Sequence, residues 1–197
     1  ETPRLAVKPM NGNGRGLNLE ALTAEEIKKL IQRVFLASTA GTGPKMVVFS
    51  GVEHGNGCSL TCARTGEVLA AMGAGSVCLV DANLRSPSLD AYFGVDNGLG
   101  LTDAVLHPGP ILDCAQRLSQ TNLSLVPVGS RAAEVERVLA SDRLGALMAE
   151  LRTEFDYVLI DASPVTWYAD AIALGQMADG VIMVLGAKST RRETALK

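Results

Sequence analysis

The chain has 197 residues, 47% hydrophobic and 20% charged, a composition typical of one globular domain large enough for a full core. Its formal net charge is −3, from 18 basic and 21 acidic residues, which gives no electrostatic reason to expect nucleic acid as a partner. No apolar run approaches the roughly 20 residues of a membrane-spanning helix. The four cysteines suit free thiols in a reducing compartment, so we expect a cytoplasmic domain.

The first part of the chain predicts a tail followed by a helix. Residues 1–19 hold two prolines and a glycine-rich run, which is typical of a flexible linker. The domain is therefore expected over residues 20–197. Thr23-Ala24-Glu25-Glu26 is a capping-box sequence, and apolar residues follow it at helical spacing. This pattern predicts a helix of about 15 residues before the first strand.

The rest of the chain alternates apolar strands with helical patterns. We expect strands at 46–50, 76–81, 123–128, 156–161 and 180–185, with a shorter partner near 115–118. We expect helices at 60–72, 101–106, 141–155, 169–177 and from about 190, with a loop at 82–100. The alternation predicts an α/β fold: a doubly wound, mainly parallel sheet with helices on both faces.

A glycine-rich turn joins the first predicted strand to the next helix, and it ends Gly55-Asn56-Gly57-Cys58-Ser59-Leu60. Glycines in such a turn let backbone N–H groups surround an anion at a helix N-terminus. Residues 55–60 are therefore the candidate phosphate cradle. The hydroxyl of Ser59 is placed to bind Mg²⁺ that accompanies a nucleotide.

Two carboxylates, Asp81 and Asp161, stand at the ends of other predicted strands. Ligands of parallel sheets bind beyond the carboxyl ends of the strands, so both should meet the phosphate cradle. Either could hold Mg²⁺ directly or through water. Asp81 is also placed to act as a base or to orient an attacking hydroxyl. The structural alternative is that such carboxylates only cap the next helix.

Three segments carry a resemblance to a known family. Residues 49–59, 79–89 and 156–165 resemble, in order, the first Walker motif, the Asp-x-Asp-x-Arg motif and the Walker B strand of the bacterial tyrosine kinases (BY-kinases). The resemblance runs from about residue 20 to the end. It implies a P-loop NTPase fold shared with the division-site and partition ATPases, with ATP or ADP and Mg²⁺ as cofactors.

The same resemblance implies a role in capsular or exopolysaccharide biosynthesis and export. The implied partner is a membrane-embedded polysaccharide co-polymerase, or a catalytically competent paralogue, at the inner face of the membrane. Self-association is a further implication. The family's tyrosine-rich tail is not in this chain, and its last strand with the adenine contacts would lie beyond Lys197. We therefore expect a domain truncated at its C-terminus.

The chain departs from the family's motifs at charged positions. The Walker lysine position holds Cys58, and the second acid of the Asp-x-Asp motif is Asn83. The self-association motif Glu-x-x-Arg-x-x-Arg aligns with Glu25, Lys28 and Ile31, so its last basic residue is missing. Two of these changes fall in the expected nucleotide site.

The missing lysine should weaken catalysis more than binding. A lysine about 4 Å from a phosphate is worth about 4 kcal/mol gross at an effective dielectric near 20, or roughly three decades in affinity or rate. Transition-state charge gathers where the lysine would lie. We therefore expect a degenerate domain that acts by binding, with weak or no ATP turnover.

Three alternatives remain open at this stage. An active kinase or ATPase could recruit Lys45 or Lys188, although neither is well placed beside the loop. A partition-type ATPase is disfavoured by the acidic charge balance. Cys58 at a helix N-terminus could instead have a lowered pKa and act as a redox or covalent switch.

Overall fold

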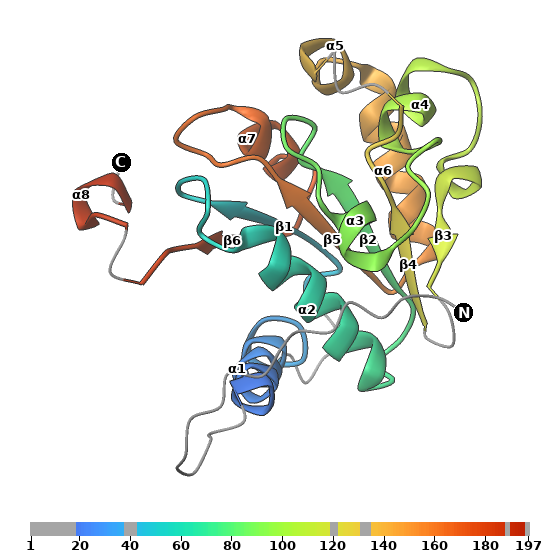
Figure 1. Cartoon of the computed structure of the whole chain (residues 1–197). Coiled ribbons are helices and arrows are strands. Elements are labelled where there is room, and N and C mark those ends of the chain that lie inside the picture. Colours follow the sequence, from blue (N-terminus) through green and yellow to red (C-terminus); the bar gives the residue numbers. More distant parts are fainter. Residues whose placement is uncertain (1–18, 38–42, 119–121, 131–134, 188–189, 196–197) are drawn as a thin grey trace.

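The computed structural model describes residues 19–37, 43–118, 122–130, 135–187 and 190–195. Within these residues, six strands form one sheet in the order β3-β4-β2-β5-β1-β6 (Figure 1). The strands are β1 (Met46–Gly51), β2 (Val77–Ala82), β3 (Gln116–Arg117), β4 (Leu123–Val126), β5 (Tyr157–Ala162) and β6 (Gly180–Val184). Every pairing is parallel except that of β3 with β4. The predicted mainly parallel sheet is confirmed.

Helices cover both faces of this sheet (Figure 1). They are α1 (Leu19–Val34), α2 (Cys58–Ala71), α3 (Leu89–Phe93), α4 (Leu101–Leu106), the 3₁₀ helix η1 (Ile111–Cys114), α5 (Val135–Leu139), α6 (Asp142–Glu154), α7 (Asp170–Gly175) and α8 (Arg192–Ala195). One buried cluster contains side chains of α1, α2 and α3, and a second contains side chains of α4, η1, α5, α6 and α7. The doubly wound architecture is therefore also confirmed.

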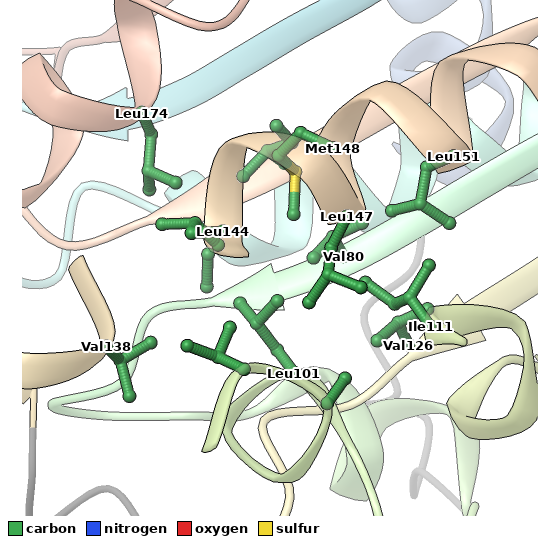
Figure 2. Close-up of a cluster of buried hydrophobic side chains, with 14 of the residues drawn as sticks. Val80, Leu101, Ile111, Val126, Val138, Leu144, Leu147, Met148, Leu151 and Leu174 are labelled. Carbon is green, nitrogen blue, oxygen red and sulfur yellow. The ribbon is translucent and has the colours of Figure 1, made fainter. Parts of the chain in front are cut away.

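The four central strands β4, β2, β5 and β1 supply both buried clusters because successive side chains point to opposite faces. Leu79 packs with α1 and α2, whereas its neighbour Val80 packs with α6. Figure 2 shows Val80 among Leu147 and Leu151 of α6 and Ile111 of η1. Central strands buried on both faces read as continuous apolar runs, which is why they were visible in the sequence.

The structure corrects several predicted boundaries. Helix α1 begins at Leu19, so Thr23 lies inside the helix and the capping-box interpretation is wrong. The segment 82–100 is not only a loop, because it contains α3 (Leu89–Phe93). Helix α7 is shorter than the expected 169–177, and neither η1 nor α5 was predicted. The predicted tail over residues 1–18 lies outside the described residues.

Helix α1 turns one position of the aligned self-association motif toward the core. Ile31 is 0% exposed and packs in the same cluster as α2. Lys28 and Glu25 form an exposed ion pair at 2.8 Å. The motif therefore presents one paired cation and no second basic side chain at the surface.

The hydropathy of the helices gives no candidate for a bilayer-spanning segment among the described residues.

Candidate nucleotide site

The phosphate cradle lies between the carboxyl end of β1 and the first turn of α2. Gly55 and Gly57 adopt left-handed backbone conformations with φ of 79° and 76°. A Cβ at either position would meet nothing within 4 Å, so conformation and not crowding requires glycine there. Gly57 is the residue directly before α2, which places the helix N-terminus at the cradle.

The cradle leaves a row of backbone donors free. Within the described residues, no acceptor receives a hydrogen bond from the N–H groups of residues 55–60. Two nearby donors are occupied: Glu53 N–H donates to Asn56 Oδ1 at 2.6 Å, and Thr61 N–H donates to Gly57 O at 2.9 Å. Asn56 Nδ2 also donates to Thr190 Oγ1 at 3.3 Å. The loop is thus held in an open, donor-rich shape that suits an anion.

A second segment, the turn from Pro164 to Tyr168, holds the loop from the side. Val165 N–H donates to Gly51 O at 3.0 Å, and the Thr166 hydroxyl donates to Val52 O. The ring of His54 in the loop lies edge-on to Trp167, with centroids 5.7 Å apart. The loop conformation therefore does not depend on a lysine.

The strand-end aspartates converge on the cradle as predicted. Asp81 and Asp161 are register partners on the adjacent parallel strands β2 and β5, and both are 0% exposed. The thiol of Cys58 donates to Asp161 Oδ1 at 3.5 Å. Asp161 Oδ2 is fully buried and has no hydrogen-bond partner among the described residues. Three distant segments thus form one site.

Burial dominates the acid–base properties of this pair. Burial, and then the charge of Asp81, raise the pKa of Asp161 to about 7, although hydrogen bonds from Ser59 and Cys58 oppose the rise. Burial also raises the pKa of Asp81 to about 6, against three backbone hydrogen bonds that lower it. The site therefore carries less negative charge near neutral pH than two surface carboxylates would.

Cys58 does not have the properties of a reactive thiolate. Burial raises its pKa far above the usual thiol range, and the neighbouring Asp161 raises it further. The helix N-terminus does not overcome these two effects. The alternative of a redox switch based on a lowered pKa at Cys58 is wrong.

Asp81 is occupied by the backbone that follows it. Its Oδ1 accepts from Asn83 N–H at 3.2 Å, and its Oδ2 accepts from Ser88 and Leu89 N–H at 3.0 Å each. Leu89 is the first residue of α3, so Asp81 anchors that helix. This matches the structural alternative for a strand-end carboxylate, and it leaves Asp81 little acceptor capacity for a metal or a substrate proton.

Asn83 links two of the three motifs. Its Oδ1 accepts from Ser163 Oγ at 3.0 Å and from Ser86 N–H at 3.3 Å. Asn83 is 8% exposed, and it lines a cavity of about 220 Å³ together with the loop residues 53–60 and Pro164. The sequence marked Asn83 only as a lost charge. Its contact with Ser163, 80 residues away, has no local sequence pattern.

Arg85 forms the main ion pair beside the site. Its Nε lies 2.9 Å from Asp170 Oδ2, and its guanidinium stacks 4.0 Å from the centroid of the Tyr168 ring. It also reaches Glu136 at 3.2 Å. The arginine of the Asp-x-Asn-x-Arg segment is thus engaged by protein groups and is not a free substitute for the lysine.

The two candidate replacement lysines do not complete the cradle. Lys45 directly precedes β1, and its backbone N–H donates to Asp179. Lys45 therefore lies at the amino end of β1, whereas the cradle follows the carboxyl end of the same strand. Lys188 lies outside the described residues. Among the described residues, no Lys or Arg side chain lines the cavity beside the cradle.

The residues fit Mg²⁺ only in part. Of the predicted ligands Ser59, Asp81 and Asp161, Asp81 is engaged by backbone donors, whereas Asp161 keeps one unpartnered oxygen. In the described part of the chain, no cluster of three His, Cys, Asp or Glu side chains could hold a metal ion. Ser59 and Asp161 remain the residues that could contact a cation brought in with a nucleotide.

Fold and site together define the class of the protein. A strand–glycine loop–helix with free N–H donors, facing acids at the ends of neighbouring parallel strands, is the arrangement of a P-loop NTPase. Solved structures agree: the chain superposes on the kinase domain of VpsO with a TM-score of 0.80, at 26% identity over 90% of this chain and 86% of that domain. Septum site-determining protein MinD from Pyrococcus horikoshii, complexed with Mg-ADP, shares the fold at 23% identity, with a TM-score of 0.59, over 71% of this chain and 57% of that one.

The chain is a homologue of the bacterial tyrosine-protein kinases. It is 29% identical over 178 residues to tyrosine-protein kinase YwqD of Bacillus subtilis, covering 90% of this chain and 74% of the relative. It is 33% identical over 143 residues to the putative tyrosine-protein kinase EpsB of Ralstonia nicotianae, covering 73% of this chain. No protein-family model matches.

The relatives also include a protein of polysaccharide biosynthesis and transport. ExoP of Rhizobium meliloti, a succinoglycan biosynthesis transport protein, is 26% identical over 149 residues, or 74% of this chain. The chain spans only 19% of ExoP, of EpsB and of the tyrosine-protein kinase Wzc of Salmonella typhimurium.

Proposed function

We propose that this domain serves exopolysaccharide biosynthesis or export as a regulatory or scaffolding component, with weak or no ATP turnover. The observation that carries the proposal is Cys58. A neutral thiol, 3.5 Å from Asp161, occupies the first turn of α2 where the kinase motif has its lysine. The exopolysaccharide role is supported by the homology to ExoP and to the tyrosine-protein kinases.

The electrostatics of the cavity support binding without efficient phosphoryl transfer. The described residues that line it include no Lys or Arg, and Arg85 is engaged by Asp170. Neutral N–H donors can hold a phosphate, but the charge that develops on a transferring phosphoryl group needs a cation close by. The ligand in this proposal is ATP or ADP. Mg²⁺, contacted by Ser59 and Asp161, would supply charge neutralisation when bound.

The proposed partner is a membrane-embedded polysaccharide co-polymerase or a catalytically competent paralogue. In this arrangement the domain would lie in the cytoplasm at the inner face of the membrane through its partner. Association, with or without bound nucleotide, would replace turnover as the output. Self-association remains a separate prediction.

The test combines turnover with binding. ATP hydrolysis and tyrosine phosphorylation are measured for the unmodified chain, for Cys58→Lys and for the neutral control Cys58→Ser. We expect ATP hydrolysis and tyrosine phosphorylation near background for the unmodified chain and for Cys58→Ser. Cys58→Lys should bind ADP more tightly by up to roughly three decades. Turnover by the unmodified chain comparable to that of YwqD would refute the proposal and support the active-kinase alternative.

Partner binding is measured separately. A membrane-embedded polysaccharide co-polymerase, solubilised in detergent, is titrated onto the immobilised domain with and without ADP. Saturable binding supports the scaffolding role. If neither the co-polymerase nor a lysine-bearing paralogue binds in either condition, the scaffolding role is wrong.

A further inference from the structure

We propose that Asn83 is a phosphate-binding residue. Its Nδ2 group and the N–H groups of the phosphate cradle together hold a phosphoryl group, and this binding does not require a divalent metal. The inference rests on the proposed nucleotide site and specifies how that site holds its ligand. Where the kinase motif has an acid, Asn83 offers an NH₂ group that can donate two hydrogen bonds.

The orientation of the Asn83 amide is fixed by its neighbours. Ser86 N–H can only donate, and it lies 3.3 Å from Asn83 Oδ1, so that atom must be the carbonyl oxygen. Ser163 Oγ donates to the same oxygen at 3.0 Å. The Nδ2 group, with two hydrogens, is therefore the free end, and within the described residues it donates to no acceptor.

The free Nδ2 group faces the cavity. Asn83 is 8% exposed and is one of the residues that line the space beside the loop. Among the described residues, Asp161 Oδ2 is the one fully buried side-chain oxygen or nitrogen without a partner. The Asn83 Nδ2 atom is therefore not fully buried, and Asn83 borders the cavity beside the loop. A polar group that is mostly desolvated and unpaired gains when a ligand supplies the acceptor.

Most of the surrounding groups favour an anion over a hydrated cation, although the acidic residue Glu53 also lines the cavity. Residues 55–60, at the N-terminus of α2, line the same cavity as Asn83, and within the described residues their N–H groups have no acceptor. Asp81 is engaged by three backbone donors, and Asp161 is 0% exposed and accepts a hydrogen bond from the Cys58 thiol. An aspartate at position 83 would add an acceptor and a negative charge that only a bound cation could reconcile with a phosphate. The amide removes that requirement.

The test is calorimetric titration of the full chain with ADP and with inorganic phosphate, once with excess EDTA and once with Mg²⁺. For the unmodified chain we expect affinities for ADP that agree within about threefold in the two buffers. Asn83→Asp should lose about tenfold to a hundredfold in EDTA, the worth of a hydrogen bond to a charged group, and regain part of it with Mg²⁺.

The matched control is Asn97→Asp. The Asn97 Oδ1 atom accepts from Gly129 N–H at 2.7 Å, and Asn97 does not line the cavity. Aspartate keeps that acceptor and adds the same charge elsewhere, so ADP affinity in EDTA should stay within about twofold of the unmodified chain.

Each other outcome overturns the inference. A loss of more than tenfold for the unmodified chain in EDTA would show that the metal is required, and this measurement needs no variant. Equal affinities for Asn83→Asp and the unmodified chain in EDTA would exclude Nδ2 as a donor. If neither the unmodified chain nor Cys58→Lys binds ADP or phosphate in either buffer, the proposed phosphate site is wrong. The scaffolding role would still be tested separately by the titration with the co-polymerase.

Discussion

Replacing the buried Asp161 by Asn should stabilise the fold at neutral and alkaline pH. Asp161 is 0% exposed, one of its oxygens has no partner among the described residues, and its register partner on the adjacent strand is Asp81. Its pKa is raised from 3.8 to about 7, so the folded chain must keep a proton or bury a charge. Asparagine keeps the oxygen that accepts from Cys58 and carries no charge.

The sign and size follow from this pKa. A raised carboxyl pKa gives a stability contribution that is complete below the unfolded pKa of 3.8 and is lost as pH rises toward about 7. At about 1.36 kcal/mol per pKa unit, the ceiling is about 4 kcal/mol. Relaxation and water entry reduce such penalties, so we expect Asp161→Asn to gain about 1–3 kcal/mol at pH 8 and less at pH 5.

Urea unfolding followed by circular dichroism at pH 5 and pH 8 measures both free energies. Asp156→Asn serves as the control of opposite sign. Hydrogen bonds from the backbone and the hydroxyl of Ser76 lower the pKa of Asp156. Asp156→Asn removes the carboxylate that these hydrogen bonds stabilise, so it should lower the free energy of unfolding at pH 8. If Asp161→Asn and the unmodified chain lose stability in parallel between pH 5 and pH 8, the reasoning is refuted.

Three further outcomes can be measured. Arg85→Met should cost about 3–5 kcal/mol in urea unfolding, because it leaves Asp170, with a side chain 4% exposed, without its cation; adding Asp170→Asn should restore part of this. Gly73→Ala should cost about 1–2 kcal/mol in thermal unfolding for its left-handed φ alone. Gly129→Ala should cost more, because a Cβ at Gly129 would also clash with the Asp103 carboxylate. Cys58, with its raised pKa, should react with iodoacetamide at pH 8 more slowly than free cysteine; faster reaction would contradict its assigned state.

The sheet and the cradle could be predicted because their causes are local in the sequence. Central strands buried on both faces, such as β2 (Val77–Ala82), are continuous apolar runs. The φ values of Gly55 and Gly57 favour glycine, so the loop is visible as glycines after a strand. Parallel topology then places Asp81 and Asp161 at the same end of the sheet. That β2 and β5 are neighbours, with the two carboxylates in register, follows from the strand order in the structure and not from the sequence pattern.

The features that the sequence did not predict depend on distant contacts or on competing local signals. Helix α3 begins where Asp81 Oδ2 accepts hydrogen bonds from the N–H groups of Ser88 and Leu89, and no periodic sequence pattern predicts these two hydrogen bonds. The pairing of Arg85 with Asp170 joins residues 85 positions apart. At α1, the capping-box sequence at Thr23 competes with four preceding residues, Leu-Glu-Ala-Leu, that are strong helix formers, and the helix extends through them.

The edge-on contact between Trp167 and His54 gives the chain an optical property. Trp167 is the only tryptophan in the sequence, its side chain is 64% exposed, and its ring lies 5.7 Å from an imidazole of the loop. Because Trp167 is the single tryptophan, all the tryptophan fluorescence of this domain originates beside the loop. Indole emission responds to solvent and to a neighbouring imidazole, so it changes when the surroundings of the loop change. Without any label, its emission spectrum reports the environment of one loop and not an average over the whole fold.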